Sequence, residues 1–146
     1  MAVRTSDATV VGSSPGECRL DSRTASSDAL PHTPQDDVVL LQSPAYVSAH
    51  KPATGEIVWT YATSCSVIPS ALGAGGMVYL PAGGLTALRP SGQPGSQVEV
   101  VWKEPKLGPS SSSPGLHEGR LYVINGAPAL TCAEAESGKV LWRLRL

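Results

Sequence analysis

Apolar residues in this chain come in short runs that are separated by turns rich in glycine, serine and proline. Runs such as 38–41, 77–80 and 121–124 have the length of a β-strand and contain many β-branched and aromatic side chains. No window shows the 3.6-residue periodicity of an amphipathic helix. The 15 glycines and 13 prolines among 146 residues also favour turns over long helices. The pattern therefore predicts an all-β chain of many short strands.

One phrase occurs three times, and each copy ends in a tryptophan. The copies span residues 49–59, 87–102 and 132–142, and they end at Trp59, Trp102 and Trp142. The tryptophans are 43 and 40 residues apart. A repeat of about 40–45 residues is the length of one four-stranded blade of a β-propeller.

The copies align over most of their length. The first and third align without a gap at an offset of 83 residues, which places 37–42 over 120–125. The second copy has a hairpin at 82–84 that is two residues shorter, and it has extra residues at 94–97 before its tryptophan. The alignment predicts that all three copies have the same strands in the same order.

Each copy offers four successive strands. A small-residue strand, expected at 67–72 and 112–116, comes before a tight turn that contains Gly76 or Gly119. A β-branched strand, a short strand that ends in a small residue and the Trp strand follow. The predicted fold is a β-propeller of four-stranded antiparallel blades, with blades at 36–62, 66–103 and 111–146. Because closed propellers have about four to eight blades, we expect a part of a larger propeller or a protomer that completes its ring by association.

The composition and charge of the chain limit the classes of partner that we expect. Residues 1–35 contain few large apolar side chains, so we expect this N-terminal segment to be disordered. The net charge is −1 and no basic stripe is present, which disfavours a nucleic-acid partner. No apolar stretch approaches the roughly 20 residues of a membrane span, and the first residues lack the apolar region of a signal peptide.

Candidate chemistry is sparse. The three cysteines and three histidines are scattered without metal-ligand spacing, and no carboxylate cluster has the spacing of a calcium loop, so we expect no metal site. Cys132 lies on an apolar strand and is interpreted as a small buried hydrophobe. The glycines of 73–76 run into a strand, unlike a phosphate-binding loop, and the serines of 109–114 form no nucleophile elbow. We therefore expect no catalytic residue in this chain.

The repeated phrase resembles the pyrroloquinoline-quinone-like (PQQ-like) propeller repeat, Ala-x-Asp-x-x-Thr-Gly-Lys-x-x-Trp. That family includes quinoprotein alcohol dehydrogenases and the barrel-assembly lipoprotein of the bacterial outer membrane. The resemblance covers about residues 37–146 and implies that the tryptophans pack between blades, held by Thr-Gly or Ser-Gly turns. The implied docking residues are Trp59, Trp102, Trp142, Thr54, Gly55, Ser91, Gly92, Ser137 and Gly138. The Asp of the pattern is replaced by Lys51, Arg89 and Glu134, so we expect the turns to be stabilised differently or less well.

The resemblance leaves three functions open. We favour a non-catalytic module, a binding or scaffold surface for a protein or polymer partner, formed by the loops at 43–46, 82–84 and 126–129. The first alternative is a fragment of a PQQ-dependent dehydrogenase, in which PQQ and Ca²⁺ would be bound by other blades. The second alternative is the sensor propeller of a signalling kinase. Tryptophans that recur in every repeat favour packing over cofactor stacking. The family implies the bacterial cell envelope or periplasm.

Overall fold

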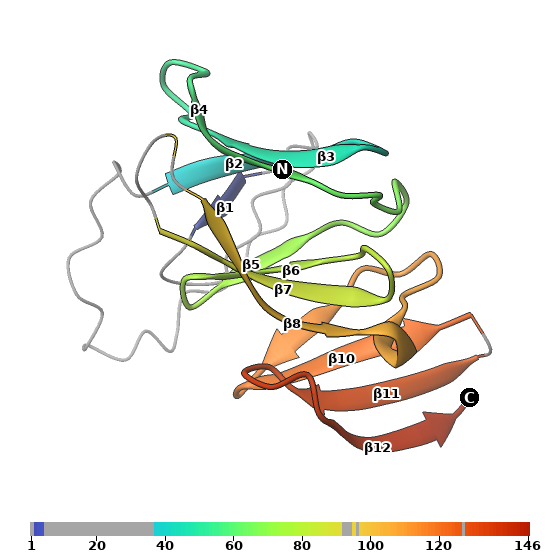
Figure 1. Cartoon of the computed structure of the whole chain (residues 1–146). Helices are drawn as coiled ribbons and strands as arrows, with labels where there is room; N and C mark the ends of the chain where they lie inside the picture. The colour runs from blue at the N-terminus through green and yellow to red at the C-terminus, as the bar shows by residue number, and fades with distance from the viewer. Residues whose placement is uncertain (1, 5–36, 92–94, 96, 127) are drawn as a thin grey trace, which may run out of the picture.

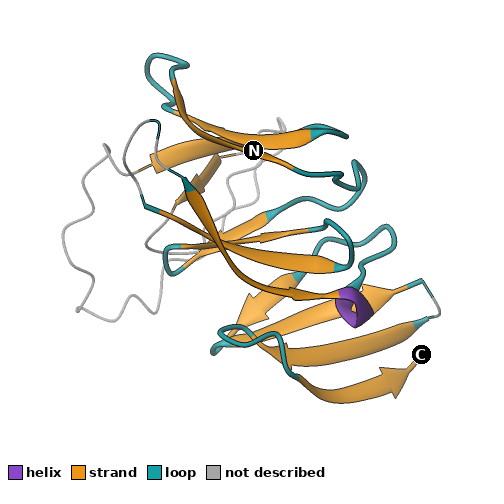
Figure 2. Ribbon diagram, in the orientation of Figure 1, coloured by secondary structure: helices purple, strands orange, loops and turns teal. Residues whose placement is uncertain are grey.

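In a computed structural model of the chain, the structure describes residues 2–4, 37–91, 95, 97–126 and 128–146. These residues form three four-stranded antiparallel sheets that lie one against the next, with a single short 3-10 helix between the second and third (Figures 1 and 2). In each sheet, strands that follow one another in the sequence are neighbours. The described residues are all-β and form three blades of a propeller, as the repeat predicts.

The strand bounds repeat from blade to blade. The first blade contains β1 (Ala2–Arg4), β2 (Asp37–Gln42), β3 (Tyr46–His50) and β4 (Ile57–Ala62). The second contains β5 (Leu72–Ala74), β6 (Met77–Leu80), β7 (Leu85–Pro90) and β8 (Val98–Glu104), and it is followed by helix η2 (Pro105–Leu107). The third contains β9 (Gly115–His117), β10 (Arg120–Asn125), β11 (Ala129–Glu134) and β12 (Val140–Arg145).

The tryptophan of each blade lies opposite a small residue of the neighbouring strand. Trp59 pairs with Ala49, Trp102 with Ala87, and Trp142 with Cys132, and all three small residues are fully buried. In each blade the register then shifts by one residue, because the residue just before the tryptophan is an extra one. A bulge at the same place in three blades is strong evidence that the blades are copies of one structural repeat.

The ungapped alignment of the first and third copies is wrong by one residue in the second strand. It places Val39 over Tyr122, but Leu40 is the residue that pairs with Ala49, as Tyr122 pairs with Cys132. The hairpin between β2 and β3 is therefore one residue shorter than its counterpart in the third blade. A shift of one residue exchanges the two faces of a strand, and accordingly Leu40 is buried whereas Leu41 is exposed.

The first strands of the blades also differ from the prediction. Those of the second and third blades are only three residues long and lie close to the glycine turns, at β5 and β9, rather than over 67–72 and 112–116. Pro69 and Pro114 fall within the expected segments and cannot donate to a sheet. In the first blade β1 occupies the same position and pairs with β2. The rest of residues 1–35, where we expect disorder, lies outside the described residues.

Two apolar cores join the three blades. The first lies between blades one and two and includes Val47, Trp59 and Leu80. The second lies between blades two and three and includes Tyr79, Leu85 and Leu121. The second blade therefore buries both of its faces. Because each core is shared by two sheets, no blade has a core of its own, as is typical of repeat proteins.

Side-chain amides hold the connections between blades. Gln42 at the end of β2 donates to the carbonyls of Ser66 and Pro69 and accepts from the amide of Ala71. Asn125 at the end of β10 donates to the carbonyl of Lys106 at 2.7 Å. Both connections therefore lie beside the hairpins that join the second and third strands.

The backbone is closely packed around Gly84, which lies in the hairpin between β6 and β7. A Cβ on Gly84 would clash with the carbonyl oxygen of Glu104 and lie 2.5 Å from Cα of Pro105, whereas a Cβ on Gly83 would meet open space. Both residues have positive φ. We expect Gly84→Ala to lower the free energy of unfolding by about 3 kcal/mol and Gly83→Ala by about 1 kcal/mol, measured by urea denaturation. Equal losses would contradict the described packing.

Candidate functional site: the contacts between blades

Trp102 makes the contact that best defines how two blades join. Its indole Nε1 donates a hydrogen bond to the carbonyl of Ala135 in the third blade at 3.0 Å. Its ring covers Gly138 of the same blade so closely that a Cβ there would lie 2.7 Å from Cε3. The ring of Tyr79 lies 6.0 Å away, between centroids. Trp102 therefore docks onto the last turn of the next blade.

The turn that receives Trp102 is defined by its backbone. The amide of Gly138 donates to the carbonyl of Glu134 at 2.9 Å, and the amide of Glu134 donates to the carbonyl of Lys139 at 2.9 Å. Gly138 has a φ of +72°, a conformation that glycine adopts without strain. Ser137 accepts a hydrogen bond from the amide of Lys139 at 3.2 Å. Ser137 and Gly138 thus shape the turn, and the carbonyl of Ala135 accepts the hydrogen bond from the indole.

The three substituted Asp positions each have a different local partner. Lys51 forms an ion pair with Glu56 at 2.8 Å, and this pair lowers the pKa of the Glu56 carboxyl. Arg89 forms an ion pair with Glu99 at 3.3 Å. Glu134 accepts a hydrogen bond from Ser137 at 2.8 Å. These exposed contacts replace the motif Asp and contribute little free energy each.

Trp59 is also buried between blades, with only 4% of its surface exposed. It belongs to the core between the first and second blades. The extra residues of the second blade add a contact beside it, because the amide of Gly95 donates to the carbonyl of Val58 at 3.0 Å. The resemblance implies a turn at Ser91 and Gly92 in the second blade. Gly92 lies outside the described residues, and Ser91 ends the described segment that follows β7.

Trp142 stands at the equivalent position of the third blade but is 42% exposed. Its ring lies 6.2 Å from that of Tyr122, which repeats the pairing of Trp102 with Tyr79. In the part of the chain that the structure describes, no fourth blade covers this face. The indole is therefore positioned for docking, but its docking surface is not filled from within the described chain.

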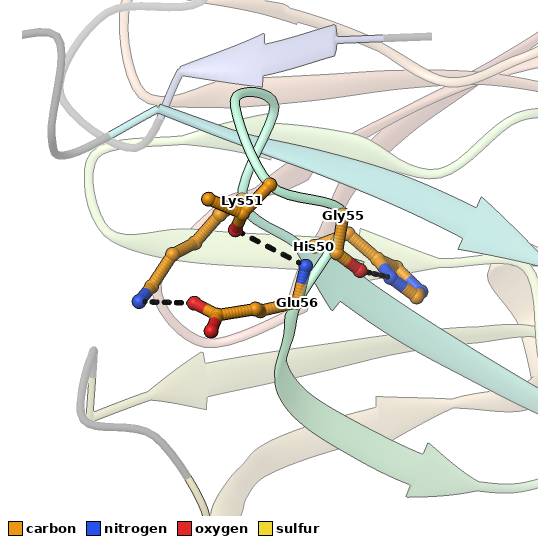
Figure 3. A network of polar contacts seen from close by, with 5 residues as sticks. His50, Lys51, Gly55 and Glu56 are labelled. Atoms are coloured by element: carbon orange, nitrogen blue, oxygen red, sulfur yellow. Dashed lines mark hydrogen bonds and ion pairs between the residues drawn. The ribbon is translucent and has the colours of Figure 1, made fainter.

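The turn of the first blade is the counterpart of the one that receives Trp102. The amide of Gly55 donates to the carbonyl of Lys51, and the amide of Lys51 donates to the carbonyl of Glu56, both at 2.9 Å. Thr54 accepts from the amide of Glu56 at 3.3 Å, as Ser137 does from Lys139. Figure 3 shows this turn with His50, which contacts the carbonyl of Gly55 at 3.0 Å.

The loops predicted to bind a partner lie together with the connections between blades. The amides of Thr63 and Cys65 donate to carbonyls within the first hairpin, 43–46, and the amide of Ser66 donates to the carbonyl of Pro81 beside the second. The amide of Leu146 donates to the carbonyl of Pro128 in the third. We refer to the three hairpins and the two connections, 63–71 and 105–114, as the connector side.

The connection at 63–71 of the connector side exposes two large apolar residues. Val67 is 63% exposed and Ile68 is 68% exposed. The backbone on both sides of them is bonded, since Ser66 donates to Pro81 and Gln42 bonds to Pro69 and Ala71. These two side chains are therefore presented on a fixed segment of backbone.

Reactive side chains on the described residues are dispersed. No group of three or more His, Cys, Asp or Glu residues that could hold a metal ion occurs among them. Cys132 is fully buried, as predicted, opposite Trp142. Burial raises the pKa of the Cys65 thiol, which keeps it in the unreactive protonated form. Burial, together with the nearby Glu136, raises the pKa of Tyr79.

Some residues of the contacts between blades could not be identified from a pattern in the sequence. Ala135 contributes only its carbonyl, and Gln42 and Asn125 act through single amide groups. Tyr79 and Tyr122 could have been found, because they lie at the same position of two copies. Over the described residues, no helix has the length and apolar character that crossing a membrane requires.

Comparison with known proteins supports this description. Residues 82–146 match the sequence profile of the family described as outer membrane protein assembly factor BamB. A quinohemoprotein alcohol dehydrogenase from Comamonas testosteroni is similar in structure, with a TM-score of 0.56 and 24% identity over 73% of this chain and 19% of that one. A quinohemoprotein alcohol dehydrogenase from Pseudomonas putida HK5 gives a TM-score of 0.57 and 19% identity over the same shares.

A europium-containing methanol dehydrogenase is similar as well, with a TM-score of 0.55 and 14% identity over 73% of this chain and 22% of that one. The chain thus spans about a fifth of the length of these solved structures. Sequence comparison with the curated proteins gives no significant match. At these identities the structural likeness concerns the fold, which is that of part of a β-propeller.

A pair of glycine variants separates the effect of docking from that of the turn. Gly138 and Gly55 have φ values of +72° and +73° in equivalent turns, but only a Cβ on Gly138 would meet a tryptophan ring. We expect Gly55→Ala to cost about 1 kcal/mol of unfolding free energy and Gly138→Ala about 1–3 kcal/mol more. Chemical denaturation at low protein concentration measures both. Identical costs would show that Trp102 does not restrict Gly138.

Proposed function

We propose that this chain, which carries PQQ-like β-propeller repeats, is a non-catalytic binding module that presents its connector side to a protein partner. The family profile that its second half matches is described as an outer membrane protein assembly factor, which supports a role in protein assembly rather than in chemistry. By the same resemblance, the proposed location is the bacterial cell envelope. A partner protein is favoured over another polymer because the exposed groups are apolar.

The observation that carries the proposal is the exposure of Val67 and Ile68 on a fixed connection. Large aliphatic side chains are unfavourably exposed to water when an ordered backbone holds them at the surface. A partner that buries them lowers the free energy of the complex. Because Gln42 and Pro81 already hold the connection, little conformational entropy is lost on binding. Tyr46, at the end of the first hairpin, is also exposed.

Variants of the connection test this role. A photoreactive residue at position 68 is expected to cross-link one protein in envelope extracts, whereas one at position 139, in the turn at the other end of the third blade, is not. The affinity of the purified partner is then measured by calorimetry. Val67→Ser/Ile68→Ser should weaken it at least tenfold, about 1.4 kcal/mol or more. The control Val100→Ser, also an exposed aliphatic residue, should leave it unchanged.

Equal binding by the double variant and by wild type would show that the connector side is not the binding surface. Equal cross-linking at positions 68 and 139 would have the same meaning, because Lys139 belongs to the opposite end of the blade.

The alternative is that these blades belong to a PQQ-dependent dehydrogenase. Three of the similar solved structures are dehydrogenases, and PQQ and Ca²⁺ are implied only under this alternative. We expect titration of the full chain with PQQ and Ca²⁺, followed by fluorescence of the exposed Trp142 and by calorimetry, to show no saturable binding. Stoichiometric binding of the quinone with reduction by an alcohol would replace our proposal by the alternative.

A further inference from the structure

Strand β12 forms a free edge of the third blade. It is the last strand of its sheet, and β11 is its one hydrogen-bonded neighbour among the described residues. Figure 1 shows β12 along the outer side of the blade. A sheet edge carries unpaired backbone N–H and C=O groups that pair readily with another extended chain. The edge of β12 is therefore a place where a further strand fits.

Arg143 and Arg145 direct their backbone groups toward this free edge. In an antiparallel pair of strands, hydrogen-bonded and non-hydrogen-bonded residue pairs alternate. The amide of Leu146 donates to the carbonyl of Pro128, just before β11, so Leu144 also bonds on the β11 side. The residues that alternate with these are Arg143 and Arg145, whose N–H and C=O groups consequently point away from β11.

The side chains of the two arginines line one groove. They lie opposite Thr131 and Ala129, two residues apart on the same strand, and thus share one face of the sheet. With Pro128 and Ala129 they line a groove of about 370 Å³. Both arginines are exposed, and neither has an ion pair or a side-chain hydrogen bond among the described residues. The described lining of the groove therefore has two positive charges and no carboxylate.

The outer strands of the other two blades have different charges. Strand β4 contains no charged residue, and β8 contains two glutamates and one lysine. That lysine, Lys103, stands at the position of Arg143, because each follows the tryptophan and pairs with a threonine. Among these three outer strands, two cations at alternate positions without an acid occur in β12 alone.

We propose that β12 binds an extended acidic segment of a partner protein as a further antiparallel strand. Backbone hydrogen bonds to Arg143 and Arg145 hold the segment along the edge. Its acidic side chains lie directly opposite the two arginines, where each guanidinium forms paired hydrogen bonds with a carboxylate. The segment has the form acid-x-acid, because alternate residues of a strand lie on the same face.

The charges of the groove favour this occupant over other strands. In an antiparallel pair with a second β12 centred on Leu144, Arg143 would lie opposite Arg145, and like charges in that position are destabilising. A neutral strand would make the backbone hydrogen bonds and leave both arginines unpaired. The arginines thus oppose pairing of the edge with itself and favour an acidic strand. This site does not use Val67 or Ile68, so it is separate from the partner surface proposed above.

Fluorescence anisotropy of labelled peptides with the full chain tests the proposal. The acidic probe is Thr-Glu-Val-Glu-Val-Thr, and the neutral probe has glutamine in place of both glutamates. We expect the acidic probe to bind with a dissociation constant of roughly 100 µM. The neutral probe, and the acidic probe on Arg143→Gln/Arg145→Gln, should each bind about fivefold more weakly or worse. Lys103→Gln, the counterpart in the second blade, should leave the affinity unchanged.

N-methylated probes distinguish an added strand from attraction by charge alone. The residues opposite Arg143 and Arg145 are the ones whose amides bond to β12. N-methylation of both glutamates should therefore abolish binding, whereas N-methylation of both valines should preserve it. Equal affinities of these two probes would overturn the proposal.

Three further outcomes would also contradict the proposed strand. One is equal binding of the acidic and neutral probes by wild type. Another is a loss of affinity in Val67→Ser/Ile68→Ser as large as in the arginine variant, which would place the peptide on the connector side. The third is self-association of Arg143→Gln/Arg145→Gln together with no binding of the acidic probe by wild type, which would show that the arginines only protect the edge. Circular dichroism checks that each variant is folded.

Discussion

The contact between a tryptophan and the glycine turn of the next blade is the constraint on which this structure depends. The indole of Trp102 needs a carbonyl, that of Ala135, and a residue without a side chain, Gly138. On its own sheet the ring needs a small neighbour, which is Ala87. The bulge before the tryptophan recurs in all three blades and changes the register at this point. One contact thus accounts for Trp102, Ala87 and Gly138.

Because that contact joins two blades, stability is shared between neighbours. The middle blade buries both faces, while the first and third each leave one face open. The difference between Trp59, at 4% exposed, and Trp142, at 42%, shows what a neighbouring blade covers. A blade is therefore not a folding unit by itself, and its energetics follow the nearest-neighbour behaviour of repeat proteins.

The sequence predicts the features that recur and fails where a feature occurs once. The strands, the glycine turns and the tryptophan positions follow from three copies of one phrase. The register of β2 does not, because Val38, Val39, Leu40 and Leu41 are all apolar and fit either face equally well. Strand β1 lies outside the aligned copies, and the Gln42 and Asn125 contacts depend on single side-chain amides that bond to the backbone.

The same distinction indicates where specificity lies. The turns at Gly55 and Gly138 have nearly the same backbone geometry, with equivalent hydrogen bonds and similar φ values. The connector side differs from blade to blade, because Gln42 and Asn125 hold their connections in different ways and only the first connection exposes Val67 and Ile68 among its described residues. Surfaces that must fit another blade are fixed by the repeat, whereas the connector side is free to vary. Recognition of a particular partner is therefore best placed on the connector side.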